Sequence, residues 1–122
     1  MSAYLLTVPL AAGKTDTWKK YMKEITESRH DDYMNSRKRL GINVEQVFLQ
    51  QTPKGDMCVV RWDTENFPRA FENMVKSQDP FDKWFRDKIL IECHDMDLSK
   101  PIPANKQVLD HHGTPSHAVA GS

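Results

Sequence analysis

The sequence predicts a single α+β domain with the split element order β-α-β-β-α-β and a four-stranded antiparallel sheet. Apolar residues recur at helical spacing between Thr15 and Leu40, two β-prone runs flank a turn at residues 52–55, and Asp79-Pro80 interrupts a later helical stretch. Helices cover one face of such a sheet, and the other face is usually covered by dimerisation.

The length and composition predict one globular domain, and the neutral net charge does not favour binding to nucleic acid or an anionic membrane. The chain has 122 residues, 39% of them hydrophobic, which is enough for one core. Seventeen basic and seventeen acidic residues cancel, so no net field attracts nucleic acid or an anionic membrane. No apolar stretch approaches the roughly 20 residues that span a bilayer. We therefore expect a soluble cytoplasmic protein, with a domain at residues 1–110 and a flexible tail at 111–122, that binds neither nucleic acid nor membrane.

The first half of the chain predicts a strand, a long helix and a hairpin. Residues 3–8 form a β-prone run that ends at Pro9. The helix that follows, about 15–40, stops at Gly41, and the cationic run 37–39 suits its carbonyl end. Strands at 44–51 and 57–63, joined through the Pro-Gly turn, then make the hairpin.

The second half predicts a broken helical segment and a last strand. Asn66-Phe67-Pro68 begins a shorter helix, and Asp79-Pro80 resets the chain into another one that reaches Ile89. After an extended stretch at residues 101–103, residues 106–110 form the last short strand. Both faces of the hairpin carry apolar residues, which indicates burial on both sides and a homodimer.

The long helix carries polar residues on its apolar stripe. Arg29, Asp32, Tyr33 and Ser36 share that stripe, and buried charges are costly unless they are paired. Two interpretations stay open: a polar pocket for a ligand, or an internal ion-pair network. Arg29 is the candidate anchor for a carboxylate or phosphate, and its alternative is a salt bridge with Glu24 or Asp32.

Acid–base chemistry has two candidate residues. His94 lies among carboxylates after an aromatic-rich helix, and it serves either as general acid or base or simply as a helix cap. Tyr33 either donates a proton or only places its ring in the core. No segment matches an established metal loop or a nucleotide-binding motif, so we predict neither a metal nor a nucleotide.

Three segments and a histidine together resemble a known family. The segments Ser36–Gly41, Phe48–Asp56 and Asp79–Phe85, followed by His94, resemble in order and spacing a family of small uncharacterised bacterial proteins assigned to the dimeric α/β-barrel, ferredoxin-like superfamily. The resemblance spans about residues 3–110. It implies that the sheets of two subunits pack into a barrel, and that a pocket lies between sheet and helices, where Arg29, Tyr33 and Ser36 would point.

The wider superfamily includes cofactor-free monooxygenases of the antibiotic-biosynthesis type, cyclases, isomerases, haem-degrading enzymes and stress-response proteins, and fold alone does not choose among them. The haem-degrading set needs Asn, Trp and His. Trp62 and His94 are counterparts here, but the first strand has no Asn.

Our leading hypothesis is a homodimeric, cofactor-independent enzyme of isomerase, cyclase, lyase or oxygenase type acting on a small carboxylate- or phenol-bearing substrate. His94 and Tyr33 would exchange protons, and the substrate-binding residues would be Arg29, Ser36, Gln50 and Trp62. The alternatives are a non-catalytic ligand-binding or stress-related dimeric module, and a haem-binding protein with His30 or His94 as axial ligand.

Overall fold

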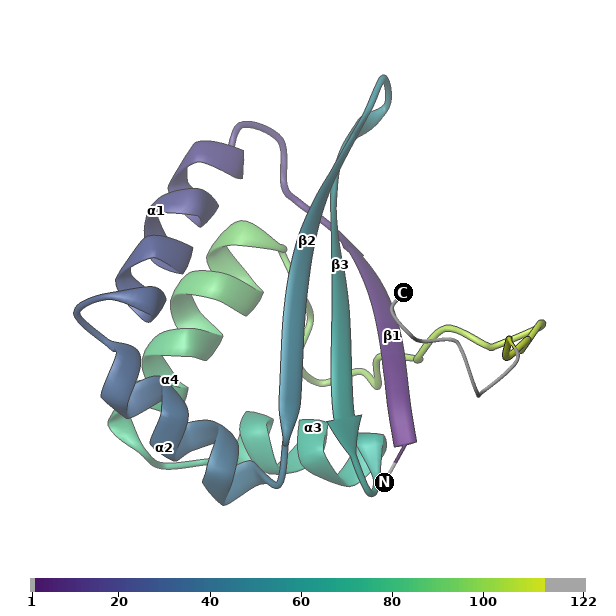
Figure 1. Cartoon of the computed structure of the whole chain (residues 1–122). Coiled ribbons are helices and arrows are strands. Elements are labelled where there is room, and N and C mark those ends of the chain that lie inside the picture. Colours follow the sequence, from purple (N-terminus) through teal and green to yellow (C-terminus); the bar gives the residue numbers. More distant parts are fainter. Residues whose placement is uncertain (1, 114–122) are drawn as a thin grey trace.

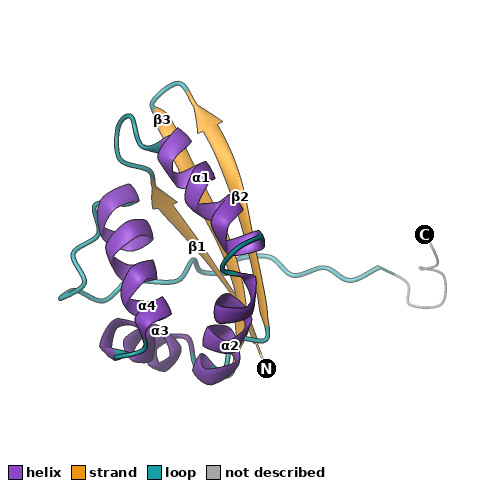
Figure 2. Cartoon of the chain, turned by 90° about the vertical axis from the view of Figure 1, so that its left-hand side faces the viewer, coloured by secondary structure: helices purple, strands orange, loops and turns teal. Residues whose placement is uncertain are grey.

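The computed structural model describes residues 2–113, in which a three-stranded antiparallel sheet carries helices on one face (Figure 1). In chain order the elements are β1 (Ser2–Pro9), α1 (Thr15–Thr26), α2 (His30–Leu40), β2 (Val44–Thr52), β3 (Gly55–Thr64), α3 (Phe67–Lys76), α4 (Pro80–Phe85) and the π-helix η1 (Arg86–Cys93). The strand order is β1-β3-β2. Figure 2 shows the labelled helices together on one side of the sheet.

The α+β class is confirmed, but the predicted four-stranded sheet is wrong for the described chain. Residues 106–110 lie extended beyond β1 and join no sheet. The segment meets β1 at Asn105, whose amide donates to the Leu5 carbonyl at 2.6 Å. Pro101 and Pro103, just before this contact, have no N–H group to donate to a strand ladder. β1 therefore remains an edge strand.

The predicted long helix at 15–40 is two helices. α1 ends at Thr26 and α2 begins at His30. At the break the Arg29 amide donates to the Glu24 carbonyl, five residues earlier, at 2.8 Å. This turn is wider than the α-helical one and shifts the helical phase. Residues on either side of the break consequently do not share the continuous stripe that the periodicity predicted.

Several boundaries are confirmed because local chemistry sets them. Gly41 adopts a left-handed φ of 73°, and its amide reaches the carbonyls of Arg37 and Lys38 at the end of α2. The Asn66 side chain accepts from the Arg69 amide at 3.0 Å and caps α3. Asp79 does the same for α4 at the predicted interruption, accepting from the Phe81 amide at 2.9 Å.

The sheet has one covered and one open face. Leu6, Val8, Cys58 and Trp62 point under the helices and are buried with the apolar side chains of α1, α3, α4 and η1. The face turned away from the helices, called the open face below, carries Ala3, Leu5, Thr7, Gln46, Phe48, Gln50, Met57, Val59 and Arg61. Leu5 is 45% exposed and Phe48 57% exposed on it. No described element covers this face.

Candidate functional site

A buried carboxylate links α2 to the sheet. Glu45 on β2 accepts the Tyr33 hydroxyl at 2.7 Å, Arg37 Nε at 2.7 Å and Trp62 Nε1 at 2.8 Å. The side chains of Arg37 and Glu45 are only 6% and 7% exposed. The Arg37 guanidinium also lies over the Tyr33 and Phe85 rings, with centroid distances of 4.9 and 4.4 Å. Glu45 thus has its charge paired and its oxygens hydrogen-bonded inside the protein.

This arrangement sets two protonation states. Burial by itself would raise the pKa of Glu45, but the Arg37 charge and the three hydrogen bonds outweigh it and lower that pKa. Burial and the neighbouring Glu45 charge raise the pKa of Tyr33 above its usual value. At neutral pH Glu45 is therefore a carboxylate and Tyr33 a neutral phenol that donates to it.

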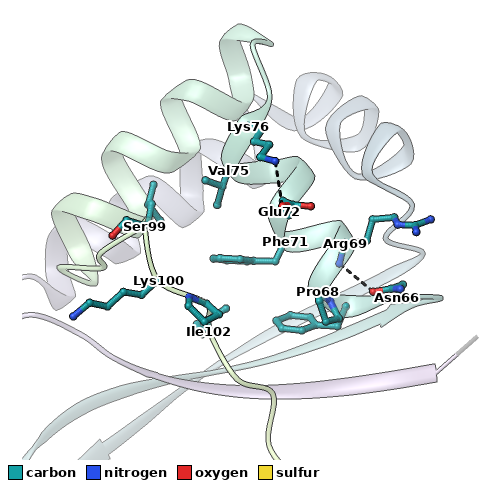
Figure 3. Close-up of a pocket in the computed structure, with 13 residues that line it drawn as sticks. Asn66, Pro68, Arg69, Phe71, Glu72, Val75, Lys76, Ser99, Lys100 and Ile102 are labelled. Atoms are coloured by element: carbon teal, nitrogen blue, oxygen red, sulfur yellow. Dashed lines mark hydrogen bonds and ion pairs between the residues drawn. The ribbon is translucent and has the colours of Figure 1, made fainter.

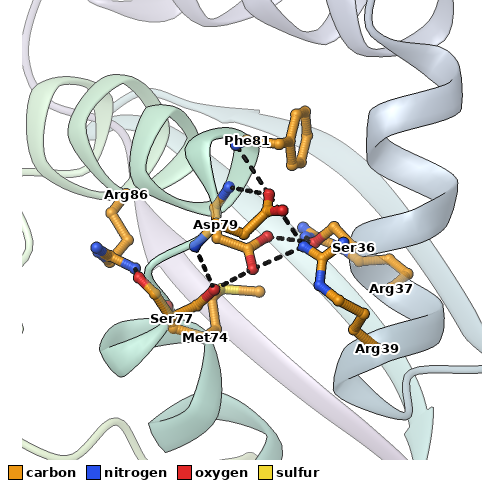
Figure 4. A network of polar contacts seen from close by, with 9 residues as sticks. Ser36, Arg37, Arg39, Met74, Ser77, Asp79, Phe81 and Arg86 are labelled. Carbon is orange, nitrogen blue, oxygen red and sulfur yellow. Dashed lines mark hydrogen bonds and ion pairs between the residues drawn. The ribbon is translucent and has the colours of Figure 1, made fainter.

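A second polar cluster joins α2 to α4 (Figure 4). Asp82, 1% exposed, accepts from the hydroxyls of Ser36 and Ser77 and from Arg39 Nη2, the last at 3.0 Å. Burial alone would raise the pKa of Asp82, but these hydrogen bonds and the Arg39 charge lower it. Arg37 Nη1 donates to Ser36 Oγ at 3.0 Å, so the two clusters are connected.

A cleft lies beside Glu45, between α1 and the edge of the sheet. Its outer part has a volume of about 470 Å³ and is lined by Trp18, Lys19, Met22, Ile25, Thr26, Tyr33, Glu45, Val47, Leu49 and Phe85. A narrower inner cavity of about 50 Å³ extends beneath the helices to Trp62 and His94. Trp18, Met22, Glu45, Val47 and Phe85 line both parts, which therefore form one mainly apolar cleft. Its polar side chains lie chiefly in the outer part.

The π-helix brings His94 to the inner cavity. Phe85, Ile89, Leu90 and His94 all line it. At roughly 80° per residue in a π-helix, His94 lies within about 20° of Phe85, whereas the roughly 100° of an α-helix would turn it about 180° away. The wide turn is visible in the His94 amide, which donates to the Ile89 carbonyl at 3.2 Å.

His94 is neutral in this position. Burial lowers its pKa, and the hydrogen bond with the Pro9 carbonyl offsets only part of that effect. Its Nδ1 lies 2.8 Å from the Pro9 oxygen, which can only accept, so Nδ1 carries the proton. The remaining ring nitrogen, Nε2, is then the proton acceptor of the imidazole.

Two buried donors have no partner among residues 2–113, Trp18 Nε1 and Arg37 Nη2. A buried donor without a partner costs roughly 1–3 kcal/mol. Trp18 lines both parts of the cleft. An oxygen atom of a ligand that reached the indole N–H would remove this cost.

The structure brings half of the predicted site residues to the cleft. Tyr33 lines the outer part, and Trp62 and His94 line the inner part. Ser36 is instead fully buried against Asp82. Gln50 lies on the open face, because successive residues of β2 alternate between the faces of the sheet.

Arg29 also lies outside the cleft. Its Nε is 3.1 Å from a Glu24 carboxylate oxygen, and its guanidinium lies 4.0 Å from the centroid of the Trp84 ring. This salt bridge is one of the pairings that the sequence left open. It accounts for the charge of Arg29 without a ligand.

Two residues of the site were missed by the sequence analysis. Arg37 was assigned to the helix dipole, although it is the buried cation of α2. Glu45 had a detectable signal, because strand alternation places it on the same face as the apolar Val47 and Leu49. A carboxylate on a core-facing strand position requires a buried partner, and Arg37 is that partner.

A second groove runs between α3 and residues 98–102 and shares Phe71 and Ile102 with the inner cavity (Figure 3). It has a volume of about 640 Å³ and apolar walls that include Phe71, Val75 and Ile102. Its rim charges include Lys76 and Glu72, which pair with each other at 3.1 Å. None of the predicted site residues lines this groove, and we do not assign the function to it.

Residues 2–113 contain neither a metal-ligand cluster nor a membrane-spanning helix. No group of three or more His, Cys, Asp or Glu side chains in this part of the chain is arranged to hold a metal ion. None of its helices is both long and apolar enough to cross a membrane.

Replacing Arg37 with leucine should lower the free energy of unfolding by about 3–5 kcal/mol, because it leaves the buried Glu45 carboxylate without its cation. Urea denaturation measures this loss. Lys38→Leu is the matched control, since it removes the same charge from an exposed neighbouring position. Arg29→Leu should cost less than about 1 kcal/mol, because its ion pair is partly exposed. Equal losses for Arg37→Leu and Lys38→Leu would contradict the network.

The Glu45 network should also make stability depend on pH. The pKa of Glu45 is lower in the folded than in the unfolded chain, so the unfolded chain binds the proton first and acid favours unfolding. The stabilisation is complete above the ordinary glutamate pKa and is lost as the pH falls through the lower folded value. Urea midpoints of Glu45→Gln, measured between about pH 7 and about pH 3, should decline less steeply than those of the wild type. Parallel profiles would show that Glu45 does not contribute.

Comparison with known proteins places the chain in a family. No curated protein matches it. The model of a family described as a family of unknown function, DUF6176, matches residues 1–102. That range includes every helix and strand of the fold and every residue that lines the cleft. The chain therefore belongs to the family of unknown function DUF6176.

Proposed function

We propose that this protein binds a small, mostly apolar organic molecule in the cleft and exchanges a proton with it through His94. The observation that carries the proposal is the cleft itself, whose outer part is lined by the Tyr33–Glu45 pair and whose inner part is lined by His94. A concave, mainly apolar site with a few convergent polar groups is typical of small-molecule binding. The reaction would be of the isomerase, cyclase, lyase or cofactor-independent oxygenase type.

The roles of the polar groups follow from their protonation. His94 offers Nε2 as a general base at neutral pH, because its Nδ1 proton is held by the Pro9 carbonyl. Tyr33 stays protonated and bonded to Glu45, so it would orient a ligand at the mouth of the cleft. The Trp18 indole N–H would donate to an acceptor oxygen such as a carbonyl, carboxylate or phenolate. The inner cavity admits only the reacting end of such a ligand, since it is small.

A non-catalytic module is the second candidate, and one observation favours it. The carboxylates of Glu45 and Asp82 are each satisfied by side chains of the protein itself. Their networks therefore need no ligand, and the polar residues of α2 are explained by stability alone. Under this interpretation ligand binding in the cleft would occur without turnover.

A thermal-shift screen against aromatic and aliphatic carboxylates, phenols, cyclic ketones and haem tests the proposal. A ligand at 100 times its dissociation constant should stabilise the fold by about 2.7 kcal/mol and raise Tm by several degrees. Val47→Trp should abolish the shift, because Val47 lines both parts of the cleft. Lys20→Trp is the control, with the same large side chain on the exposed side of α1.

His94→Gln separates the two candidate functions. It should retain the thermal shift and lose turnover if His94 acts as the base, with a loss of roughly 10²-fold or more in kcat. Unchanged turnover of a confirmed ligand would refute the base assignment. A haem-induced Soret shift that disappears in His94→Gln would instead favour the haem-binding alternative.

We also propose that a second copy of the chain covers the open face, giving a homodimer whose two sheets form a barrel. The exposed Leu5 and Phe48 side chains support this. Phe48→Asp should raise the dimer dissociation constant at least about tenfold, because it places a charge in the centre of the interface. Light scattering across a concentration series measures this change. A wild-type protein that stays monomeric at high concentration would contradict the homodimer.

A further inference from the structure

The chain after Ile102 forms an arm, residues 104–113, that leaves the body of the protein. Asn105 anchors the arm to β1 through the Leu5 carbonyl and, at 3.0 Å, through Thr7 Oγ1. Beyond Asn105 the arm extends away on the side of the sheet opposite the helices (Figures 1 and 2). Val108 is 91% exposed and Leu109 81% exposed there. Two adjacent large apolar side chains thus stand in water at the end of an anchored, extended segment.

Val108 and Leu109 are adjacent in the sequence, and this indicates what kind of surface would bury them both. Adjacent residues of an extended chain point to opposite sides. A surface that buried only one side of the arm would leave either Val108 or Leu109 exposed. An arm that becomes a strand between two layers has both sides covered. The arm therefore has the character of a strand with both faces covered, although it pairs with no strand in the described chain.

The area of the open face shows what an arm would add to a dimer. Strands of about eight residues, at about 3.3 Å each, and three strands about 4.8 Å apart give the face a flat footprint of roughly 26 by 14 Å. Side chains make its accessible surface larger than this footprint, so two such faces reach about the lower end of the roughly 1,200–2,000 Å² that stable interfaces bury. A pair of exchanged arms supplies additional buried area.

One two-fold arrangement of the dimer brings the arm within reach of the partner's sheet. A two-fold axis that runs parallel to the strands, between the two stacked sheets, places β1 of one copy opposite β2 of the other, because β1 and β2 are the two edges of the sheet. Stacked sheets lie about 10 Å apart, and three extended residues span about the same distance. From its anchor at Asn105, the arm then arrives at the partner's sheet near Val108.

We propose that residues 106–110 cross to a second copy, where the residues from Val108 onward add as an edge strand to its β2. β2 is an edge strand in the described chain, and addition of an extended segment to such an edge is an established mode of association. Val47 and Leu49 of β2 line the outer cleft. The arm of one copy therefore forms part of the wall beside the cleft of the other, so the inference rests on the proposed dimer and on the proposed cleft.

Sedimentation velocity of the full chain tests the energetic contribution of the arm. The double substitution Val108→Asp and Leu109→Asp should raise the dimer dissociation constant at least about 30-fold, since two apolar side chains that become buried are replaced by charges. Lys100→Asp is the matched control, because it makes the same change in net charge at an exposed position before the anchor. Equal dissociation constants for the double variant and the wild type would overturn the proposal while leaving the dimer through the open face intact.

Paramagnetic relaxation in a mixed dimer tests where the arm lies. A nitroxide on His111→Cys preserves Val108 and Leu109, and the native Cys58 and Cys93 are buried away from the reagent. This copy is mixed with a ¹⁵N-labelled, spin-free copy. The amide signals of β2 in the ¹⁵N copy should lose the most intensity. Intensity loss that is strongest in β1, or no loss between copies, would overturn the proposed pairing.

Ligand binding distinguishes failure of the arm proposal from failure of the proposed function. Wild-type protein should give a thermal shift that the arm double variant reduces and Lys100→Asp retains. If the two variants and the wild type respond equally, the arm does not contribute to the cleft, and the cleft still binds. If none of the three responds while the label still reports arm exchange, the assignment of the cleft fails and the strand addition stands.

Discussion

The buried Glu45 carboxylate is the constraint from which the arrangement of the helices follows. It lies on the covered face of β2, where an unpaired charge would be too costly, and Arg37 provides the neutralising charge. α2 must therefore approach β2 closely enough for Arg37 and Tyr33 to reach the carboxylate. Asp82 fixes the other side of α2 by holding Ser36 and Arg39 against α4. Held on both sides, α2 closes one end of the layer between helices and sheet, and the cleft remains beside α1.

The polar residues of the protein fall into two groups, those that stabilise the fold and those that could take part in a reaction. The Ser36 hydroxyl is hydrogen-bonded to Asp82, the Arg37 charge is paired with Glu45, and Arg29 pairs with Glu24 outside the cleft. The polar side of α2 is thus mostly explained by folding stability. Chemical reactivity is expected where a titratable group is neutral, partly buried and adjacent to apolar space. His94 meets these conditions, and it comes from the other end of the chain.

Local chemistry made part of this structure predictable. Gly41, Asn66 and Asp79-Pro80 each act through hydrogen bonds or backbone preferences within a few residues, so their helix boundaries could be derived from the sequence. The break before His30 contains neither Gly nor Pro and left no such signal. The π-helix η1 could not be predicted from the sequence either, because the periodicity analysis assumes the roughly 100° per residue of an α-helix. A cation in the last turn of α2 is favourable whether its side chain is buried or exposed, so the sequence did not show that Arg37 is buried. Its ion pair with the buried Glu45 explains the burial.

β2 combines two properties that are usually separate. It is the wall of the cleft, through Glu45, Val47 and Leu49, and it is also a free edge of the sheet. A ligand that orders the cleft must act on the strand to which a second copy would add. If both events occur, thermodynamic reciprocity requires that each changes the affinity of the other by the same factor. The fourth strand, which the sequence pattern suggested and a single copy does not form, would then be the element through which the two sites communicate.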